Sequence, residues 1–284
     1  MRDIALMVAL VVLCCGSLRA APSAHNPVHQ LVEDYFAVRA SEAYSSGLNG
    51  RDPLKAQQAF VAKLTPRLGK RVGYKVGLVS REAQQKYGVD APVRGVLLSK
   101  MLLRNGAEVP ANFGVHPICE ADLIVVVKDR GINKARTPLE VVKHLKELVA
   151  FIELPDAFIS SNQPVDGALL TAINVGARLG VLGQRLPIIP SAGFVTALED
   201  MSVVITDQTG ADLGRVPGRA ILDNPLNAVL WLIEELAKSG EKLRAGDLIS
   251  LGSLKALTPQ ADQTITVRYE GLPGGTIKAS VRFK

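Results

Sequence analysis

The chain has 284 residues, of which 48% are hydrophobic and 21% are charged, and its formal net charge is +6. A chain of this length and composition can bury a large hydrophobic core. Its basic residues form no runs interleaved with aromatic residues, which argues against a nucleic-acid partner. The small positive excess indicates either attraction for small anions such as carboxylic acids or an ordinary solvated surface.

The first 24 residues, MRDIALMVALVVLCCGSLRAAPSA, have the pattern of a secretory signal peptide. Arg2 supplies a basic start, residues 4–15 an apolar stretch, and Ala20 lies in a cleavage zone of small residues. The apolar stretch is shorter than the ~20 residues that a transmembrane helix needs. We therefore expect cleavage near Ala20, export to the periplasm and no stable membrane span afterwards. An uncleaved membrane anchor is the alternative.

After cleavage the chain retains one cysteine, Cys119. An intramolecular disulfide is then impossible, although a signal peptide implies an oxidising compartment. The stability of the mature chain must therefore come from its hydrophobic core.

Residues 25–70 are predicted to form a helical N-terminal region, because apolar residues recur at three- and four-residue spacing. In residues 71–284, short β-prone runs are separated by Gly, Pro and Asp, which predicts one α+β domain rich in antiparallel strands. The β-prone runs are residues 93–98, 121–127, 151–154, 201–207, 247–254 and 263–272.

Two helices are expected to interrupt these strands. The first covers residues 136–148, where Thr137, Pro138 and Glu140 have the spacing of an N-cap, a first-turn proline and a capping-box acid. The second covers residues 224–240, whose apolar residues form one stripe at helical spacing.

Acidic residues interrupt two of the β-prone runs. Glu120 and Asp122 are two positions apart in PICEADLIVVV, so they point to the same face of a strand. Two such carboxylates repel each other, and a Mg²⁺ or Mn²⁺ ion would balance them with oxygen ligands. Glu153 in AFIELPD is a third candidate ligand. The alternative is that these acids lie at solvated strand ends.

Lys75 lies in the locally apolar segment VGYKVGL. A lysine in apolar surroundings is suited to proton transfer, because burial favours its neutral form. The alternative is a lysine on the polar face of an alternating strand. The sequence has no dinucleotide fingerprint, no phosphate-binding P-loop, no histidines at metal-ligand spacing and no serine in a nucleophile-elbow context.

The order of several short motifs resembles one enzyme group. GYKVGL is followed by QQKYGVDAP, EAD, IEL, NPLNAVLWL and AGDLISLGSL. In this order and spacing, which extend over roughly residues 30–284, the motifs are similar to those of 2-keto-4-pentenoate (2-hydroxypenta-2,4-dienoate) hydratases and 2-oxo-3-hexenedioate decarboxylases. These enzymes form a branch of the fumarylacetoacetate hydrolase superfamily.

The resemblance implies a mixed β-roll with a helical N-terminal region, assembled as a homo-oligomer. It also implies a Mg²⁺ or Mn²⁺ site at Glu120, Asp122 and Glu153, with Lys75 as the catalytic proton carrier beside a small 2-oxo acid. The substrate-binding residues that it implies are Asn174, Ser253 and Leu254.

The chain departs from the family pattern at several positions. Asp122 stands where the family usually has glutamate, and Val93 and Arg94 occupy a position that is usually acidic. Ile173 replaces an aspartate, and Phe158 lies in a segment that is usually polar. We therefore expect a changed substrate pocket. The signal peptide is also unusual for a family that works mostly in cytoplasmic catabolism of aromatic compounds.

The leading functional hypothesis is a divalent-metal-dependent lyase that hydrates 2-hydroxypenta-2,4-dienoate to 4-hydroxy-2-oxopentanoate. Three alternatives stay open: decarboxylation of a 2-oxo-3-hexenedioate-type acid, hydrolysis of an acylpyruvate, and an exported relative that only binds a carboxylate or a metal. Acylpyruvate hydrolysis ranks lower, because no histidine matches the one that usually assists the attacking water.

Overall fold

The computed structural model describes residues 27–42, 47, 48 and 50–284. The signal peptide predicted for residues 1–24 lies outside the described residues. Among the helices that the structure describes, none combines the length and apolarity that a membrane crossing requires.

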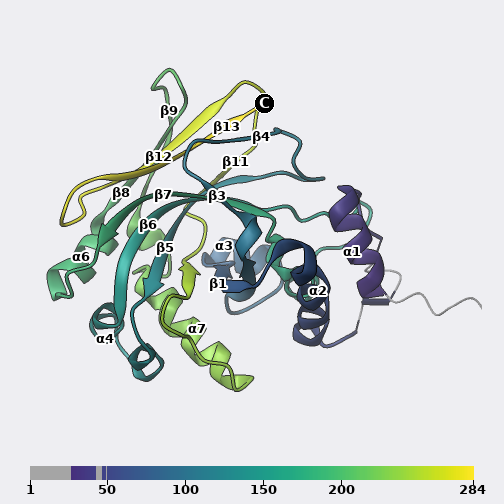
Figure 1. The fold of residues 1–284 in the computed structure, drawn as a ribbon, viewed down its shortest axis with the longest axis horizontal. Helices are drawn as coiled ribbons and strands as arrows, with labels where there is room; N and C mark the ends of the chain where they lie inside the picture. Colours follow the sequence, from purple (N-terminus) through teal and green to yellow (C-terminus); the bar gives the residue numbers. More distant parts are fainter. Residues whose placement is uncertain (1–26, 43–46, 49) are drawn as a thin grey trace, which may run out of the picture.

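In the described residues the strands form two sheets (Figure 1). The larger sheet has the order β2-β1-β10-β5-β6-β7-β3, with β11 also paired to β5. Its strands are β1 (Arg71–Gly77), β2 (Val93–Leu98), β3 (Leu102–Arg104), β5 (Cys119–Val127), β6 (Leu145–Leu154), β7 (Leu179–Pro187), β10 (Leu248–Ser250) and β11 (Lys255–Leu257). The smaller sheet has the order β4-β13-β12-β8-β9. Its strands are β4 (Ala107–Val109), β8 (Ser202–Thr206), β9 (Asp212–Pro217), β12 (Thr264–Glu270) and β13 (Ile277–Phe283).

Helices cover the ends and the open side of the curled larger sheet (Figure 1). They are α1 (Pro27–Ala37), α2 (Pro53–Leu68), α3 (Arg81–Lys86), α4 (Pro138–Lys143), α5 (Gly167–Ala172), α6 (Ala192–Asp200) and α7 (Leu226–Lys238). The chain also forms short 3-10 helices, among them η3 (Arg130–Lys134) and η4 (Asn174–Gly176). The curled mixed sheet with a helical N-terminal region confirms the predicted fold class.

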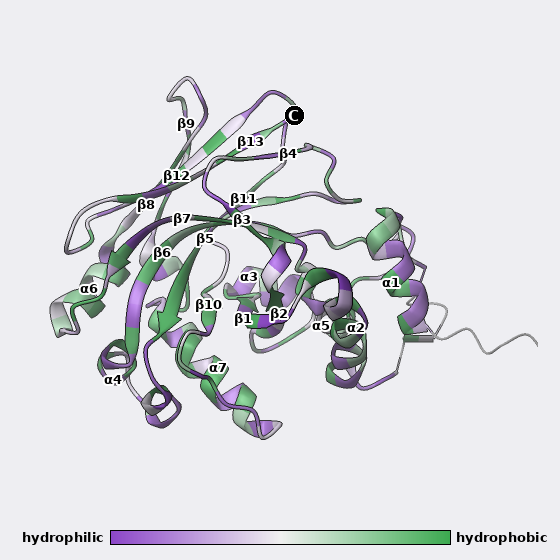
Figure 2. Ribbon diagram, in the orientation of Figure 1, coloured by the Kyte–Doolittle hydropathy of each residue, from purple (hydrophilic) through white to green (hydrophobic). Residues whose placement is uncertain are grey.

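The core has two main parts. The first lies between the sheets and α7, and its centre is the apolar run of β5, which is strongly hydrophobic in Figure 2. The second joins α1 and α2 to α5 and contains Tyr35, Phe60 and Phe158. Free Cys119 is buried in the first cluster. The first cluster includes residues of β1, β5 and β6. The second includes residues of α1, α2 and α5.

The N-terminal helices are tied to the rest of the chain. The side-chain amide of Gln57 on α2 is buried, and it donates hydrogen bonds to the carbonyl oxygens of Arg94 (2.7 Å) and Thr171 (2.8 Å). Asp52 caps α2 by accepting bonds from two backbone amides. The boundary predicted between residues 25–70 and 71–284 stays a prediction, since the second hydrophobic cluster extends across it.

One predicted helix is shorter than expected. The helix predicted over residues 136–148 begins as expected, with Thr137 as its N-cap and Pro138 in its first turn, but it ends at Lys143. From Leu145 the chain forms β6, which pairs with β5 on one side and β7 on the other. Backbone pairing inside a central sheet therefore overrides the local helical pattern.

Candidate functional site

Lys75 lies near the middle of β1, between β2 and β10. Its side chain is only 3% exposed, and its ammonium group forms an ion pair with Glu153 on β6. Lys75 Nζ also donates a hydrogen bond to the carbonyl oxygen of Val175 (3.0 Å). On β2, Gly95 makes room for this lysine, because a Cβ there would lie 2.8 Å from Lys75 Cγ. The sequence motif thus places an ammonium group inside the protein.

Glu120 and Glu153 are direct register partners on the antiparallel strands β5 and β6. Like charges at directly opposed positions destabilise a sheet. Loss of solvation and the neighbouring Glu153 carboxylate raise the pKa of Glu120 to about 8, although Lys75 and a hydrogen bond from Ser253 act in the opposite direction. The pair therefore favours the presence of a further positive charge.

Asp122 is fully buried, and protein donors occupy both of its carboxylate oxygens. Oδ2 accepts from the Ser250 hydroxyl (2.5 Å), whereas Oδ1 accepts from the backbone N–H groups of Gly252 (3.1 Å) and Leu123. Burial and the Glu153 carboxylate raise the pKa of Asp122 to about 7, even though these hydrogen bonds lower it. Asp122 is thus close to the two glutamates, but its carboxylate is turned into the sheet.

The chain bulges between β10 and β11. Both strands pair with β5, and the segment between Ser250 and Lys255 has more residues than the β5 segment opposite it. Gly252 forms this bulge with a φ of +116°, where a Cβ would lie 2.5 Å from the Val79 side chain. The bulge brings Ser253 and Leu254 to the lining of a cavity, and their role in substrate binding stays a prediction.

The segment η4 carries backbone strain beside Lys75. Asn174, Val175 and Gly176 all have positive φ values, of 59°, 53° and 64°. This conformation is rare for a β-branched residue such as valine, and such strain is typical of functional segments. The strain turns the Val175 carbonyl toward Lys75.

Asn174 holds this segment in place. Its side chain accepts from the Val96 N–H (2.7 Å) and donates to the Val96 carbonyl (2.9 Å). Asn174 is completely buried and is not among the residues that line the cavity. Asn174 therefore positions Val175, while its predicted contact with substrate stays a prediction.

These groups line a cavity of about 390 Å³. Its lining includes Lys75, Glu120, Glu153 and Ser253. It also includes Lys86, Tyr87, Ala157, Leu170 and Gly176. A cavity of this size suits a small ligand. Lys86 and Tyr87 were not predicted as cavity residues, although both lie in the motif QQKYGVDAP.

Most departures from the family pattern lie outside the cavity. Phe158 and Ile173 are buried in the second hydrophobic cluster. Arg94 is 4% exposed, and it pairs with Glu241 (2.8 Å) and donates to the Ser239 hydroxyl (3.0 Å). Phe158 and Ile173 thus add apolar side chains to the core, and Arg94 adds an ion pair. Of the altered segments, only Ala157 reaches the cavity wall.

The side chains at the site fit a divalent cation with two protein carboxylates. Three carboxylates, of Glu120, Asp122 and Glu153, share one ammonium group, so a cation would restore charge balance. In the described part of the chain, no group of three or more His, Cys, Asp or Glu side chains is arranged to hold a metal ion. Mg²⁺ commonly takes only one or two carboxylates and completes its shell with water and substrate oxygens. Glu120 and Glu153 meet that requirement, whereas Asp122 already accepts three hydrogen bonds.

Comparison with known proteins identifies relatives with the same architecture. No family description matched the chain in a scan of known families. The 2-keto-4-pentenoate hydratase of Paraburkholderia phymatum is 32% identical over 210 residues, which cover 74% of this chain and 77% of the relative. The 4-oxalocrotonate decarboxylase of Pseudomonas putida is 27% identical over 261 residues and 90% of both chains.

Solved structures agree with this relationship. The 4-oxalocrotonate decarboxylase of Pseudomonas putida G7, complexed with magnesium and adipate, matches with a TM-score of 0.78 and 24% identity over 91% of this chain and 96% of that chain. A fumarylpyruvate hydrolase of Pseudomonas aeruginosa, in complex with Mn²⁺ and pyruvate, matches with a TM-score of 0.54 and 14% identity over 76% of this chain and 90% of that chain.

The curled mixed sheet is shared with these solved structures. The chain belongs to the 2-keto-4-pentenoate hydratase family.

Proposed function

We propose that the protein is a divalent-metal-dependent lyase that acts on a small 2-oxo or 2-hydroxydienoic acid. The observation that carries this proposal is the arrangement of buried Lys75 and Glu153 with the partly buried Glu120 in the lining of a cavity of about 390 Å³. Hydratases and a decarboxylase among the relatives support a lyase reaction. We assign hydration of 2-hydroxypenta-2,4-dienoate as the main activity, with decarboxylation of an oxalocrotonate-type acid as the second candidate.

Glu120 and Glu153 would hold Mg²⁺ or Mn²⁺. When bound, such an ion supplies Lewis-acid stabilisation of negative charge on the carboxylate and 2-oxo oxygens of the substrate. Solved relatives in complex with magnesium and with Mn²⁺ support this choice of ion. Asp122 supports the site by fixing Ser250 and Gly252.

Lys75 is the residue placed to move a proton. An ammonium group has three N–H donors. Those of Lys75 serve Glu153 and the Val175 carbonyl, so one donor is left for a ligand in the cavity. Lys75 can therefore hold a proton beside the substrate and exchange it during enol–keto interconversion. The strained η4 segment fixes the direction of this ammonium group.

The test uses purified mature protein with 2-hydroxypenta-2,4-dienoate. Loss of the dienol absorbance is followed with Mn²⁺, after chelation, and after Mn²⁺ is restored. Metal-dependent loss well above the uncatalysed rate, with 4-hydroxy-2-oxopentanoate as product, would establish the hydratase. Turnover of an oxalocrotonate-type acid with release of CO₂, and none of the dienoate, would establish the decarboxylase. No turnover of either acid by metal-loaded protein would overturn the proposal.

The cellular location is a separate proposal that rests on residues 1–24. The charge and length of this segment support export to the periplasm after cleavage near Ala20. N-terminal sequencing of protein from the periplasmic fraction is expected to begin near Ala21. An intact N-terminus on cytoplasmic protein would contradict export. Assembly as a homo-oligomer is likewise proposed from the resemblance, and light scattering of the mature protein tests it.

A further inference from the structure

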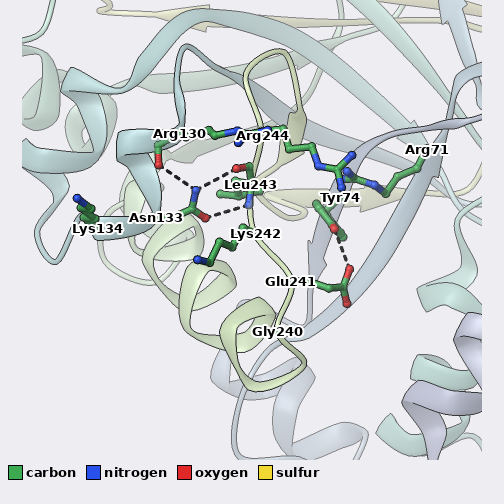
Figure 3. A pocket seen from close by; sticks show the side chains of 10 residues that line it. All are labelled: Arg71, Tyr74, Arg130, Asn133, Lys134, Gly240, Glu241, Lys242, Leu243 and Arg244. Atoms are coloured by element: carbon green, nitrogen blue, oxygen red, sulfur yellow. Dashed lines mark hydrogen bonds between the residues drawn. The ribbon is translucent and has the colours of Figure 1, made fainter.

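A second cavity, of about 600 Å³, is bordered by Arg71 and Tyr74 of β1 (Figure 3). Tyr74 lines this cavity, whereas Lys75, the next residue on the strand, lines the proposed lyase site. The two cavities have no lining residue in common, so they are separate sites that border one strand.

The second cavity is strongly basic. Its lining contains five cationic side chains and a single carboxylate, that of Glu241. The five cations are Arg71, Arg130, Lys134, Lys242 and Arg244. Arg71 pairs with Asp247 at 3.2 Å. Among the described residues, the side chains of the other four form no ion pair, so the cavity has a large uncompensated positive charge.

Glu241 does not neutralise the four free cations. Its carboxylate accepts hydrogen bonds from the Tyr74 hydroxyl (3.0 Å) and the Ser239 hydroxyl (3.1 Å), and it pairs with Arg94 (2.8 Å). Arg94 is buried and does not line the cavity, so it already balances the charge of Glu241.

Backbone contacts fix the segments that carry these cations. Asn133 accepts from the Leu243 N–H (2.9 Å) and donates to the carbonyl oxygens of Leu243 (2.9 Å) and Arg130 (3.0 Å) (Figure 3). These bonds connect η3 to the segment that follows α7. The guanidinium of Arg71 lies 4.7 Å from the centre of the Tyr74 ring. The backbone segments that carry the cations are thus held together, which reduces the ordering cost of binding a ligand.

We infer that this basic cavity binds a small polyanion that carries two or more phosphate groups. Its volume is in the range of small-molecule sites, roughly 300–1,000 Å³. A single carboxylate would balance only a fraction of the free charge, whereas a phosphate chain presents several charges and many acceptor oxygens. Guanidinium groups match phosphate oxygens with paired N–H donors, and lysines add point charges.

The test is calorimetric titration of the metal-free mature protein with inorganic tripolyphosphate and, separately, with orthophosphate. The titrations are made near physiological ionic strength, where charges more than about 8 Å apart are largely screened. We expect one tripolyphosphate per chain and an affinity at least tenfold above that for orthophosphate.

Two double variants make the assignment specific. Lys242→Gln with Arg244→Gln is expected to lower tripolyphosphate affinity at least tenfold. The matched control, Lys63→Gln with Lys278→Gln, removes the same charge from exposed positions on α2 and β13 and should change affinity less than twofold. All four positions are exposed, so both proteins are expected to fold, and their melting temperatures verify this.

Other results would overturn the inference. They are an equal loss of affinity in both double variants, no saturable binding of tripolyphosphate, or binding that disappears in Lys86→Gln, which removes an exposed cation from the proposed lyase cavity. The last result would place the polyanion in the proposed lyase site. The binding measurement needs no turnover, so its outcome is independent of the proposed lyase activity.

Discussion

Lys75 pairs with Glu153, while Glu153 also lies directly opposite Glu120 on the neighbouring strand. A single buried ammonium group is therefore shared by carboxylates that repel each other. Burial first, and then repulsion from Glu153, raise the pKa of Glu120, and the excess of carboxylates explains why the site favours a bound cation. The predictions below separate the residues that would hold the ion from those that support it.

Glu120→Gln is expected to lower Mn²⁺ affinity at least tenfold, because the substitution removes an anionic oxygen ligand. Losses of about 10- to 100-fold are typical even when only a residue that supports a ligand is changed. The melting temperature of the metal-free protein should stay the same or rise, since the repulsion from Glu153 is relieved. Metal titration by calorimetry measures the first effect, and Glu108→Gln on the exposed strand β4 serves as control. An unchanged affinity in Glu120→Gln would remove this residue from the ligand set.

Lys75→Ala is expected to abolish turnover while Mn²⁺ binding is retained or becomes tighter. Loss of the ammonium group leaves Glu153 without its partner, and breaking a buried ion pair in this way costs about 3–5 kcal/mol. Bound metal should recover much of that stability. Single-turnover kinetics and denaturation with and without Mn²⁺ measure these effects. Full activity in this variant would show that another group moves the proton.

Asp122→Asn is expected to destabilise the protein by about 1–3 kcal/mol, because its buried hydrogen-bond donors lose a charged acceptor. Ser250→Ala should have an effect of the same kind, since its hydroxyl donates to Asp122. Mn²⁺ affinity should fall less in both variants than in Glu120→Gln, because neither side chain is expected to touch the ion. If Asp122→Asn instead weakens Mn²⁺ as strongly as Glu120→Gln, then Asp122 is a ligand, as the resemblance first implied.

Gly252→Ala is expected to destabilise the protein by roughly 1–3 kcal/mol through backbone strain, with an added cost from the clash with Val79. Activity should fall as well, because the bulge positions Ser253. The control is Gly210→Ala, which has a φ of +85° but no atom within 4 Å of the added Cβ. It isolates the backbone contribution, so its loss of stability should be smaller. Equal losses in both variants would mean that the contact with Val79 is unimportant.

The sequence was most informative where local periodicity decides the outcome. The position of β5, and of Glu120 and Asp122 two residues apart on it, follows from the alternation of strand side chains. The carboxylate contacts of Asp122 were not predictable, because Ser250 and Gly252 are 128 and 130 positions away in the chain. The end of α4 at Lys143 was missed for a similar reason, since β6 is stabilised by pairing with strands on both sides. Non-local contacts also gave Asn174 its role, which its sequence neighbours do not reveal.

The lining of the proposed lyase cavity comes from different parts of the fold. Lys75 and the two glutamates lie on strands of the larger sheet, while Tyr87, Ala157 and Leu170 pack with the second hydrophobic cluster. Substitutions among these three residues can therefore change which acids are accepted without moving the charged groups. Such a separation lets substrate range evolve independently of the chemistry, and it offers Ala157 and Leu170 as starting positions for directed evolution.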